Sequence, residues 1–419
     1  MRLLVAVDHH FVRDHDGMVY LGPPMAIAGY SFWKVYLQVF DEILVLARVR
    51  QAAQRPPKAV PAGGERVFFF DLPDYLGPWE YLRSLIRLRG RVQQAVARCD
   101  AFILRVPGAI GQLAWQVLRQ SGRSYGVEVT ADPWDMYSPG AVPSIGRPVA
   151  RNRWSILLRE MCRQAPCVSY VTREALQRRY PPGSGTWSTY ASDVDLKEGA
   201  VEPEGMELRI RRLREVAASG EGSRRWRIGF VGAFAQMYKA PDILMRAAAA
   251  CARGLEFTLE FVGDGKYKAP MERLAHQLGL ASRARFLGAL PPGQAVQKFL
   301  DRMDLFVLPS RQEGLPRAMV EAMARGCPCI GSTVGGIPEL LAPEDLVPPG
   351  DADALAAKIR EVLSEPTRME RMARRNWERA KDFQPETLLQ RRLEFCREVR
   401  RQAEQGHRSD PVLAARSFV

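Results

Sequence analysis

Short apolar runs alternate with amphipathic segments along almost the whole chain, and this alternation constrains the fold more than any other feature. Most runs are separated by Ala-, Leu- and Arg-rich segments with a helical pattern. Strands that alternate with helices predict parallel sheets covered by helices, which is an α/β fold. The predicted strands are residues 3–7, 43–47, 67–70, 101–104, 124–129, 167–171, 227–231, 258–262, 284–287, 305–308 and 328–330.

The length of 419 residues is too great for a single core and predicts two domains. Residues 195–225 combine a polar helical pattern with an SGEGS stretch, which is a linker composition. We therefore predict one α/β domain over residues 1–200 and another over 222–382. The remaining segment, 383–419, continues a long basic helical pattern and is expected to cross back to the first domain.

Composition indicates an ordinary globular protein, with 47% apolar and 26% charged residues. No apolar run reaches the ~18 residues that a membrane span requires. The opening MRLLVAVD is expected to be a first strand rather than a signal peptide. The seven cysteines form no CxxC pair, so we expect a reducing, cytoplasmic environment.

The net charge of +13 comes mostly from arginine, and part of it is clustered. Residues 146–179 hold eight Arg and two Glu. A second cluster comprises Arg83, Arg87, Arg89, Arg91 and Arg98. Such clusters are either solvated helix faces or a surface attracted to anionic phospholipid, which would make the protein peripheral to the membrane. Nucleic acid is not expected as a partner, because no known binding module is present.

The stretch SRQEGLPRAMVEAMARG places an acid at the mouth of a predicted helix and a second acid inside it. Glu313 follows the strand DLFVL, at the strand end where open α/β sheets bind ligands. Glu321 should lie roughly 8–12 Å further along the helix. Amides and a glycine between two acids at this spacing suit a sugar, a diphosphate and a ribose in a row. The alternatives are a capping acid and a solvent-exposed helix position.

Neighbouring segments repeat the strand–turn–helix pattern. Lys239 stands between the strand IGFVG and a helix predicted to start near Pro241, a position suited to phosphate. FVGDG, RFLG and GGIPELL add further glycine turns after strands. Such loops at one sheet edge favour a common ligand site over unrelated turns.

The second half resembles the nucleotide-sugar domain of family 4 retaining glycosyltransferases of the GT-B fold, of the bacterial polysaccharide type. The motifs that carry the resemblance are GFVGAFAQMYKAPDIL, FVGDG, RFLG, DLFVLPS and EGLPRAMVEAMARGCPCIGSTVGGIPELL. The resemblance is good from residue 227 to 361 and loose in the first half. It implies two Rossmann-like domains whose parallel sheets face each other across a cleft.

The resemblance also implies roles for residues of this chain. Glu313 would contact the donor sugar, Lys239 would neutralise the departing diphosphate, and Glu321 would bind the ribose. Other implied donor contacts are Gly232, Leu287 beside the base, Arg311, Gly314, Leu315 and Pro316, with Arg317 as a further candidate for phosphate. Two departures are clear, because Ala233 and Phe234 follow Gly232 where the family often has arginine, and Ala240 replaces a usual glycine.

The first half should bind the acceptor. Residues 8–20 are expected to form a loop at the cleft, with Asp16 and Gly17 as acceptor contacts. Arg105 precedes a possible helix entry at Pro107, and Glu128 and Asp132 lie at the end of a predicted strand. The last two resemble the family's ExxxDPWD motif, although each of the three could equally be an ion-pair or turn residue. The histidines of DHHFVRDHDG lack a fourth ligand at familiar spacing, so no metal is expected. Asp193-Val194-Asp195 is interpreted as a linker turn.

The predicted function is therefore retaining, metal-independent and cofactor-free transfer of a sugar from a nucleoside diphosphate to a hydroxyl of a saccharide or lipid-linked saccharide, in the synthesis of a cell-surface polymer. Glycosylation of a small natural product and nucleotide-sugar epimerisation on the same scaffold are the alternatives, together with a phosphorylase and a catalytically silent binding protein. A dehydrogenase is disfavoured, because the first strand leads into DHHFVRDHDG rather than GxGxxG.

Overall fold

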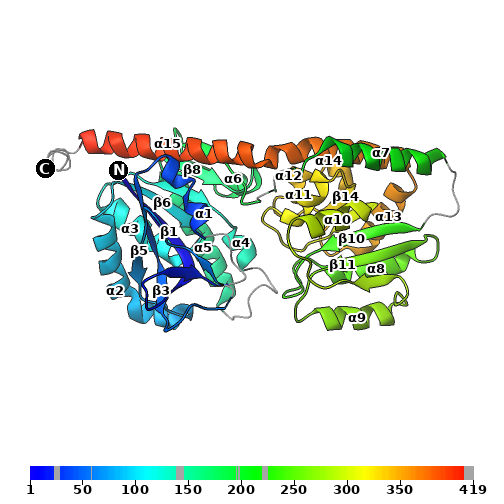
Figure 1. The fold of residues 1–419 in the computed structure, drawn as a ribbon, viewed down its shortest axis with the longest axis horizontal. Coiled ribbons are helices and arrows are strands. Elements are labelled where there is room, and N and C mark those ends of the chain that lie inside the picture. Colours follow the sequence, from blue (N-terminus) through cyan, green and yellow to red (C-terminus); the bar gives the residue numbers. More distant parts are fainter. Residues whose placement is uncertain are drawn as a thin grey trace.

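The computed structural model describes residues 1–22, 29–57, 59–137, 146–194, 196, 199–218 and 225–409. Two α/β domains lie side by side, each built around its own sheet, and the C-terminal helices form a row along one side of both (Figure 1). The seven cysteines are all buried and unpaired. No helix in these described ranges has both the length and the apolar character needed to cross a membrane.

The first sheet is centred on β1, which pairs in parallel with β3 on one side and β6 on the other. From β6 the sheet continues through β7 and β8 to β9, and from β3 it continues to β5, all in parallel. Only β2 and β4 run antiparallel to their neighbours. The strands are β1 (Arg2–Arg13), β2 (Val19–Leu21), β3 (Glu42–Gln51), β4 (Val60–Pro61), β5 (Val67–Leu72), β6 (Ala101–Val106), β7 (Gly126–Val129), β8 (Cys167–Tyr170) and β9 (Trp187–Tyr190).

Helices cover both faces of this sheet because its strands carry apolar residues on both sides. One core contains side chains of α2, α3 and α5, and the core on the opposite face contains side chains of α1, η1 and α15. The helices are α1 (Tyr30–Trp33), η1 (Tyr36–Gln38), α2 (Gly77–Val96), α3 (Ala109–Gln120), α4 (Pro133–Met136), α5 (Arg147–Gln164), α6 (Ala175–Arg179) and α15 (Pro385–Ser409).

The second sheet has six parallel strands in the order β12-β11-β10-β13-β14-β15. Its central strands are mostly buried and mostly apolar, as expected for a parallel sheet covered on both faces. The strands are β10 (Trp226–Val231), β11 (Phe257–Val262), β12 (Ala284–Phe286), β13 (Leu305–Leu308), β14 (Cys329–Ser332) and β15 (Leu346–Val347). The predicted α/β class with two mainly parallel sheets is confirmed.

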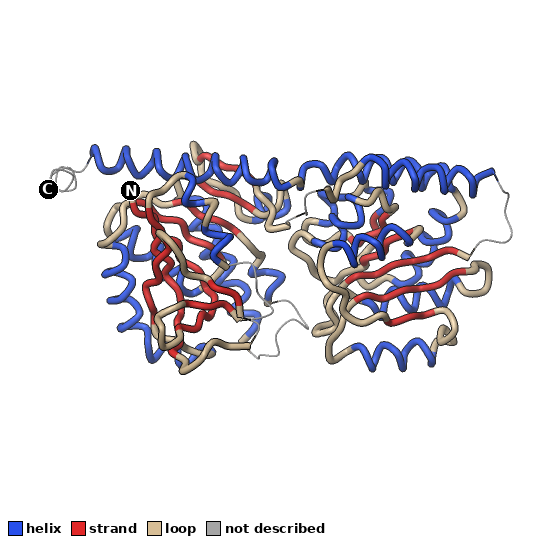
Figure 2. The backbone as a smooth tube through the Cα atoms, in the orientation of Figure 1, coloured by secondary structure: helices blue, strands red, loops and turns tan. Residues whose placement is uncertain are grey.

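Helices α8 and α9 lie below this sheet in the view of Figure 1, and α7 and α14 lie above it. The loops of the second domain face the first domain (Figure 2). The helices are α7 (Pro203–Ala218), α8 (Pro241–Cys251), α9 (Lys268–Gln277), α10 (Gln294–Arg302), α11 (Arg317–Ala324), α12 (Ile337–Leu340), η2 (Pro343–Asp345), α13 (Ala352–Leu363), α14 (Pro366–Ala380) and η3 (Lys381–Phe383).

Two helices connect the domains in ways that matter for the site. Helix α7, which the sequence placed in the connecting stretch, packs on α14 through Met206, Ile210 and Trp377 and so belongs to the second domain. Helix α15 buries Phe395 and Val399 against the sheet of the first domain. The chain therefore returns to the first domain at its C-terminal end.

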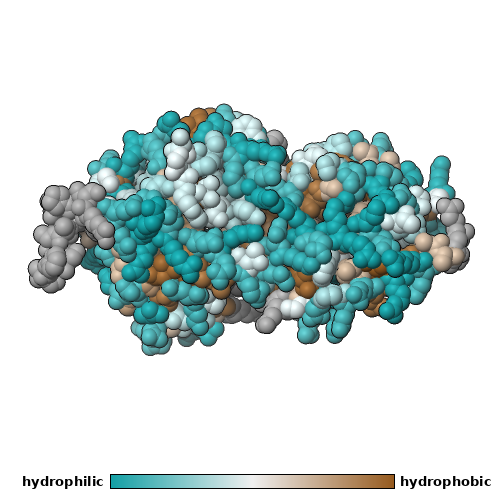
Figure 3. Space-filling model, turned by 90° about the horizontal axis from the view of Figure 1, so that it is seen from above, coloured by the Kyte–Doolittle hydropathy of each residue, from teal (hydrophilic) through white to brown (hydrophobic). Residues whose placement is uncertain are grey.

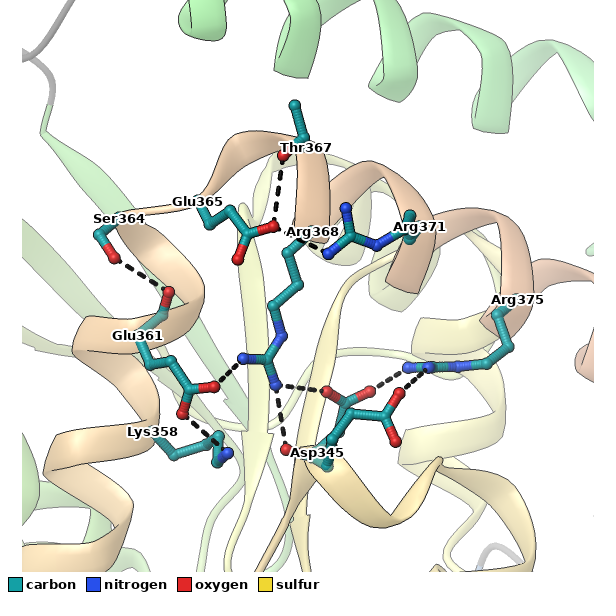
Figure 4. Close-up of polar contacts among 10 residues, drawn as sticks. Asp345, Lys358, Glu361, Ser364, Glu365, Thr367, Arg368, Arg371 and Arg375 are labelled. Carbon is teal, nitrogen blue, oxygen red and sulfur yellow. Dashed lines mark hydrogen bonds and ion pairs between the residues drawn. The ribbon is translucent and has the colours of Figure 1, made fainter.

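A buried ion-pair cluster holds the last helices of the second domain together (Figure 4). Asp345 is fully buried and pairs with Arg368 at 3.0 Å and with Arg375, both from α14. Arg368 also pairs with Glu361 of α13. Because removal of one partner would leave a buried charge unpaired, this cluster fixes α13 and α14 beside η2.

Candidate functional site

A lysine and a glutamate far apart in the sequence meet at the carboxyl end of the second sheet. Lys239, in the loop between β10 and α8, places its Nζ 2.8 Å from Oε1 of Glu313, in the loop between β13 and α11. Both side chains are largely buried, with 14% and 7% exposure. Ser310, fully buried, donates its hydroxyl to the same carboxylate oxygen at 2.9 Å. The glutamate is thus held by one cation and one neutral donor.

Glycines leave the space in which this pair sits. A Cβ on Gly232 would lie 2.5 Å from Cδ of Lys239, so the glycine makes room for the lysine chain. A Cβ on Gly335 would lie 1.9 Å from the carbonyl oxygen of Glu313, and Gly336 donates its N–H to the carbonyl of Gly314 at 2.6 Å. The glycine turns recognised in the sequence therefore allow neighbouring loops to pack closely.

Helix α11 begins at Arg317, with Pro316 as its N-cap, which is one residue later than the start at Pro316 that the sequence favours. Open space surrounds the Cα of Gly314, where no atom lies within 4 Å of an added Cβ. The first turn of a helix leaves its N–H groups without intrahelical acceptors. Leu315 packs partly against the core of the second domain. An anion placed beside Gly314 would therefore meet free amides and the lysine.

Two arginines expected near phosphate are engaged elsewhere in the unliganded protein. Arg311 forms two bonds to the carboxylate of Asp242, at 2.9 and 2.7 Å, and the pKa of Arg311 is raised by that carboxylate. Arg317 lies 3.5 Å from Glu321, one helical turn away. Burial raises the pKa of Glu321, while Arg317 opposes this rise.

Just before α8, alanine stands at position 240, where the resembled family usually has glycine. The backbone there nevertheless keeps a conformation that suits glycine. Ala240 has φ +53° and ψ +49°, the left-handed conformation in which glycine is favoured. On the far side of the loop cluster, Leu287 donates its N–H to the carbonyl of Phe261 at 2.9 Å. Its side chain is partly exposed, and it is not among the residues that line the cleft beside Glu313.

In the first domain, Arg105 and Glu128 lie on adjacent strands and form a buried ion pair at 2.6 Å. The hydroxyl of Tyr36 donates to the same carboxylate at 2.9 Å, and Asp193 lies 3.2 Å from the guanidinium. Burial alone would lower the pKa of Arg105, but the two carboxylates raise it overall. A small hollow borders this network, and Arg392 of α15 is among the residues that line it.

Asp132 has a structural role that the sequence left open. Its carboxylate caps α4 by accepting the N–H of Trp134 at 2.8 Å, and it also pairs with Arg179 and accepts the hydroxyl of Tyr180. Asp135, one turn later, lies 3.5 Å from Arg179. Burial, followed by the neighbouring Asp132 charge, raises the pKa of Asp135 to about 6.

A cleft of about 510 Å³ is lined by residues of both domains. The second domain contributes Glu313, Gly314, Leu315 and Arg317 to its walls, and the first domain contributes Asp132, Asp135 and Asp193. The hollow beside Arg105 and Glu128 shares Thr130, Val171 and Asp193 with it. A donor held at Glu313 would therefore face the polar side chains of the first domain.

The expected acceptor loop over residues 8–20 is not a loop, and this prediction is wrong. Strand β1 continues to Arg13 because Phe11 and Val12 remain buried, and it turns back into β2. Gly17, at φ +80°, forms the turn, and the side chain of Asp16 is 70% exposed beside His15. Neither residue lines the cleft that contains Glu313.

Three polar residues of the site were not identified from the sequence. Ser310 ends the DLFVLPS motif, but no role of its own was predicted for it from the sequence. Asp135 is the second acid of the DPWD motif, but only the first acid, Asp132, was predicted to contact the acceptor. Asp193 was interpreted as part of a linker turn, but it lines the cleft and pairs with Arg105. Ser310 and Asp193 lie two and three residues after the ends of β13 and β9, and a polar residue shortly after a strand was the available signal in these two cases.

Sequence comparisons agree with this geometry. The sequence profile described as glycosyl transferases group 1 matches residues 212–379, which contain the second sheet and the Lys239–Glu313 pair. Protein CapJ of Staphylococcus aureus is 27% identical over 376 residues, which span 88% of each chain. A 2-deoxystreptamine glucosyltransferase of Streptomyces kanamyceticus is 31% identical over 193 residues, 44% of this chain and 49% of the relative. The amylovoran biosynthesis glycosyltransferase AmsK of Erwinia amylovora is 36% identical over 110 residues, 24% of this chain and 27% of the relative.

Solved structures share the fold over nearly the full length. Sucrose-phosphate synthase from Thermosynechococcus elongatus superimposes with a TM-score of 0.66 at 18% identity, covering 95% of this chain and 99% of that one. Anabaena HepE, in complex with UDP-glucose, gives 0.60 at 19% identity and covers 94% and 98%. The predicted GT-B architecture is confirmed, and the comparisons together support a group 1 glycosyltransferase with relatives in polysaccharide biosynthesis.

Proposed function

We propose that this group 1 glycosyltransferase moves a sugar from a nucleoside diphosphate to a hydroxyl of a saccharide or lipid-linked saccharide. The single observation that carries the proposal is the Lys239–Glu313 pair, 2.8 Å apart and almost buried at the cleft. Glu313 would contact the sugar, and Glu321 would bind the ribose. Anabaena HepE has been crystallised with UDP-glucose, which makes a uridine nucleotide the first donor to test.

In this proposal the barrier falls mainly because charge on the departing diphosphate is stabilised. Lys239 would release Glu313 in part and turn its Nζ to the phosphates, while the amides around Gly314 and Leu315 bind the remaining oxygens. Preformed donors in a cleft screened from water cost little reorganisation during the reaction. We propose that the reaction retains the anomeric configuration and needs no metal, as the resemblance to family 4 implies.

The acceptor would enter from the first domain. Arg105, Glu128 and Asp193 present paired charges and hydrogen-bonding groups beside the cleft, which suits a neutral polyhydroxyl group. The relation to a polymer-forming glycosyltransferase favours a saccharide acceptor. A small natural product is the second candidate, because one relative is a 2-deoxystreptamine glucosyltransferase.

Variants of the pair test the assignment directly. We expect Glu313→Gln and Lys239→Ala each to lower turnover by roughly 10²–10³-fold without loss of folding, because each removes one preorganised charge. The measurement is nucleotide release from a panel of UDP-, GDP- and ADP-sugars with and without acceptor extracts. Without an acceptor, release should be slow for a transferase.

The matched controls are Glu378→Gln and Lys381→Ala, which break an exposed ion pair of the same 2.8 Å length outside the cleft. These controls should retain full turnover. Near-normal activity in both cleft variants would remove the assignment, and so would the absence of binding heat with every nucleotide sugar at millimolar concentration.

A further inference from the structure

The first half of α2 exposes a stripe of large apolar side chains. Trp79, Leu82 and Ile86 are 76%, 56% and 91% exposed. Their spacing of three and four residues places them on one helix face. The buried residues of α2 begin only at Leu88 and lie on the opposite side. Exposed apolar side chains on one face mark an interaction surface.

Helix α5 shows the same arrangement. Val149 and Ile156 are 72% and 65% exposed, seven residues apart on one face, and border a shallow hollow together with Arg153 and Leu157. The fully buried residues of α5 begin at Ser155. The N-terminal halves of α2 and α5 thus both present side chains that the core does not use.

The two helices belong to the same layer of the first domain. Their C-terminal halves contribute to one core, on the same side of the sheet. Arg153 of α5 lies close enough to Tyr81 of α2 to influence its pKa, which burial raises and Arg153 lowers. Asp8 acts on Tyr81 and also on Tyr137, which follows the cleft-lining helix α4. Helix α5 also contacts α4, whose Asp135 and Met136 line the cleft, so the α5 stripe lies next to the first-domain side of the cleft.

Positive charge accompanies these stripes without compensation. Arg83, Arg87 and Arg153 are exposed, and none forms an ion pair with any residue in the described ranges. By contrast, the arginines on α14 and α15 are largely paired with glutamates, as Arg374 is with Glu370 and Arg401 with Glu398. Figure 3 shows the face over α15, which is predominantly hydrophilic. The combination of apolar stripe and free arginine is thus a property of α2 and α5.

We propose that the α2–α5 face docks onto an anionic lipid bilayer. The apolar side chains would enter the boundary between headgroups and acyl chains, and the arginines would contact lipid phosphates. An acidic protein would match the charge, but a stripe running along two helices fits a broad, continuous surface better. The face is defined by Trp79, Leu82, Arg83, Ile86 and Arg87 of α2 and by Val149, Arg153 and Ile156 of α5.

The inference rests on these helices alone and stands whether or not the proposed transfer reaction is correct. It gives the protein a fixed orientation, with the cleft entrance close to the headgroups. A saccharide carried on a lipid would then reach Arg105 and Glu128 without leaving the membrane surface.

Flotation of the full-length protein with vesicles tests the proposal. We expect binding to vesicles containing phosphatidylglycerol, weak binding to pure phosphatidylcholine, and loss of binding as salt rises from about 0.05 M to about 0.5 M. Arg83→Gln with Arg87→Gln should weaken binding roughly thirtyfold, because each basic residue contributes about a fivefold step. Trp79→Ser with Ile86→Ser should weaken it at least about tenfold.

The control is Arg246→Gln with Arg302→Gln, which removes the same charge from exposed positions on α8 and α10. Binding of this variant should match the wild type. Brominated lipid should quench tryptophan fluorescence in the wild type and less in Trp79→Ser. No binding to anionic vesicles at low salt would overturn the proposal, as would equal loss in the control. Donor-dependent nucleotide release in detergent should be unchanged in every variant. This measurement therefore distinguishes failure of the membrane proposal from failure of the proposed reaction.

Discussion

At the scale of single residues, the site is a set of charges that compensate one another before any ligand arrives. Lys239 and Glu313 are buried together, and neither would be stable in that place without the other. Ser310 also donates its hydroxyl to the carboxylate of Glu313 and helps to hold it in place. A diphosphate that binds Lys239 would replace part of this pairing, so the unliganded arrangement holds the lysine where the donor needs it.

Asp135 is the exception, because its charge is poorly compensated. Its pKa is raised to about 6, first by burial and then by the adjacent Asp132 charge. An aspartate in an unfolded chain titrates near 4, so the folded protein resists ionisation of this group between about pH 4 and pH 6. The free energy of unfolding should therefore fall as pH rises through this window, and the loss persists above it.

Asp135→Asn removes this cost and should raise the free energy of unfolding at pH 7.5 by about 1–3 kcal/mol. At pH 4 the difference should shrink to about 0.5 kcal/mol or less, because the carboxyl is then protonated in the folded protein and about half protonated in the unfolded chain. Denaturant titrations at the two pH values measure the effect. Asp353→Asn, at an exposed position in the first turn of α13, is the control and should show no such gain. An equal difference at both pH values would contradict the explanation.

At the scale of elements, the site is made by loops that can approach closely only because they contain glycine. Gly335, at φ +54°, lies directly against the carbonyl of Glu313. Gly263 lies in the same way against the carbonyl of Gly232. The β14–α12 loop thus supports the β13–α11 loop, and the β11–α9 loop supports the loop that follows β10.

Gly335→Ala should therefore disturb donor binding as well as stability. The left-handed conformation costs alanine about 1–2 kcal/mol, and the added methyl group must in addition displace the backbone of Glu313. We expect the dissociation constant of the donor to rise at least about tenfold, as measured by calorimetry.

The matched control is Gly279→Ala, at φ +71° with no atom near an added Cβ. It should lower the free energy of unfolding by the conformational cost alone and leave donor affinity unchanged. Similar donor affinity in both variants would mean that the Gly335 contact does not position Glu313.

Contacts between elements also decide which strands and site residues could be predicted from the sequence and which could not. Strands such as Leu305–Leu308 are buried on both faces, so a plain apolar run identifies them. The extension of β1 to Arg13 was missed because His9 and His10 interrupt the run, although Phe11 continues to pack. Ser310 gains its role only through contact with a side chain three residues later. Asp193 gains its role through a strand 88 residues away, a partnership that no local pattern encodes.

At the scale of the whole molecule, two connections set the geometry of the cleft. Helix α15 returns to the first domain, where Arg392 donates to the carbonyl of Ser192 at 2.6 Å. The second connection is Glu339 of α12 in the second domain. Its carboxylate accepts the backbone N–H groups of Arg173, Glu174 and Ala175, just before α6 of the first domain. Because the contact uses a flexible side chain on one domain and main chain on the other, it can form and break as the domains move.

Glu339→Ala removes this contact and leaves the chain connections intact. Charged hydrogen bonds contribute about 1.5–3 kcal/mol each at most, so loss of the set should lower the closed population at least about tenfold. Small-angle scattering should show a larger radius of gyration than in the wild type, and thermal unfolding of each domain should change little.

KM for the donor should rise as well if closure completes the site, because Glu313 would then face the first domain less often. Glu378→Ala, which breaks only an exposed pair with Lys381, serves as the control and should scatter like the wild type. An unchanged radius for Glu339→Ala would show that α15 alone holds the two domains together.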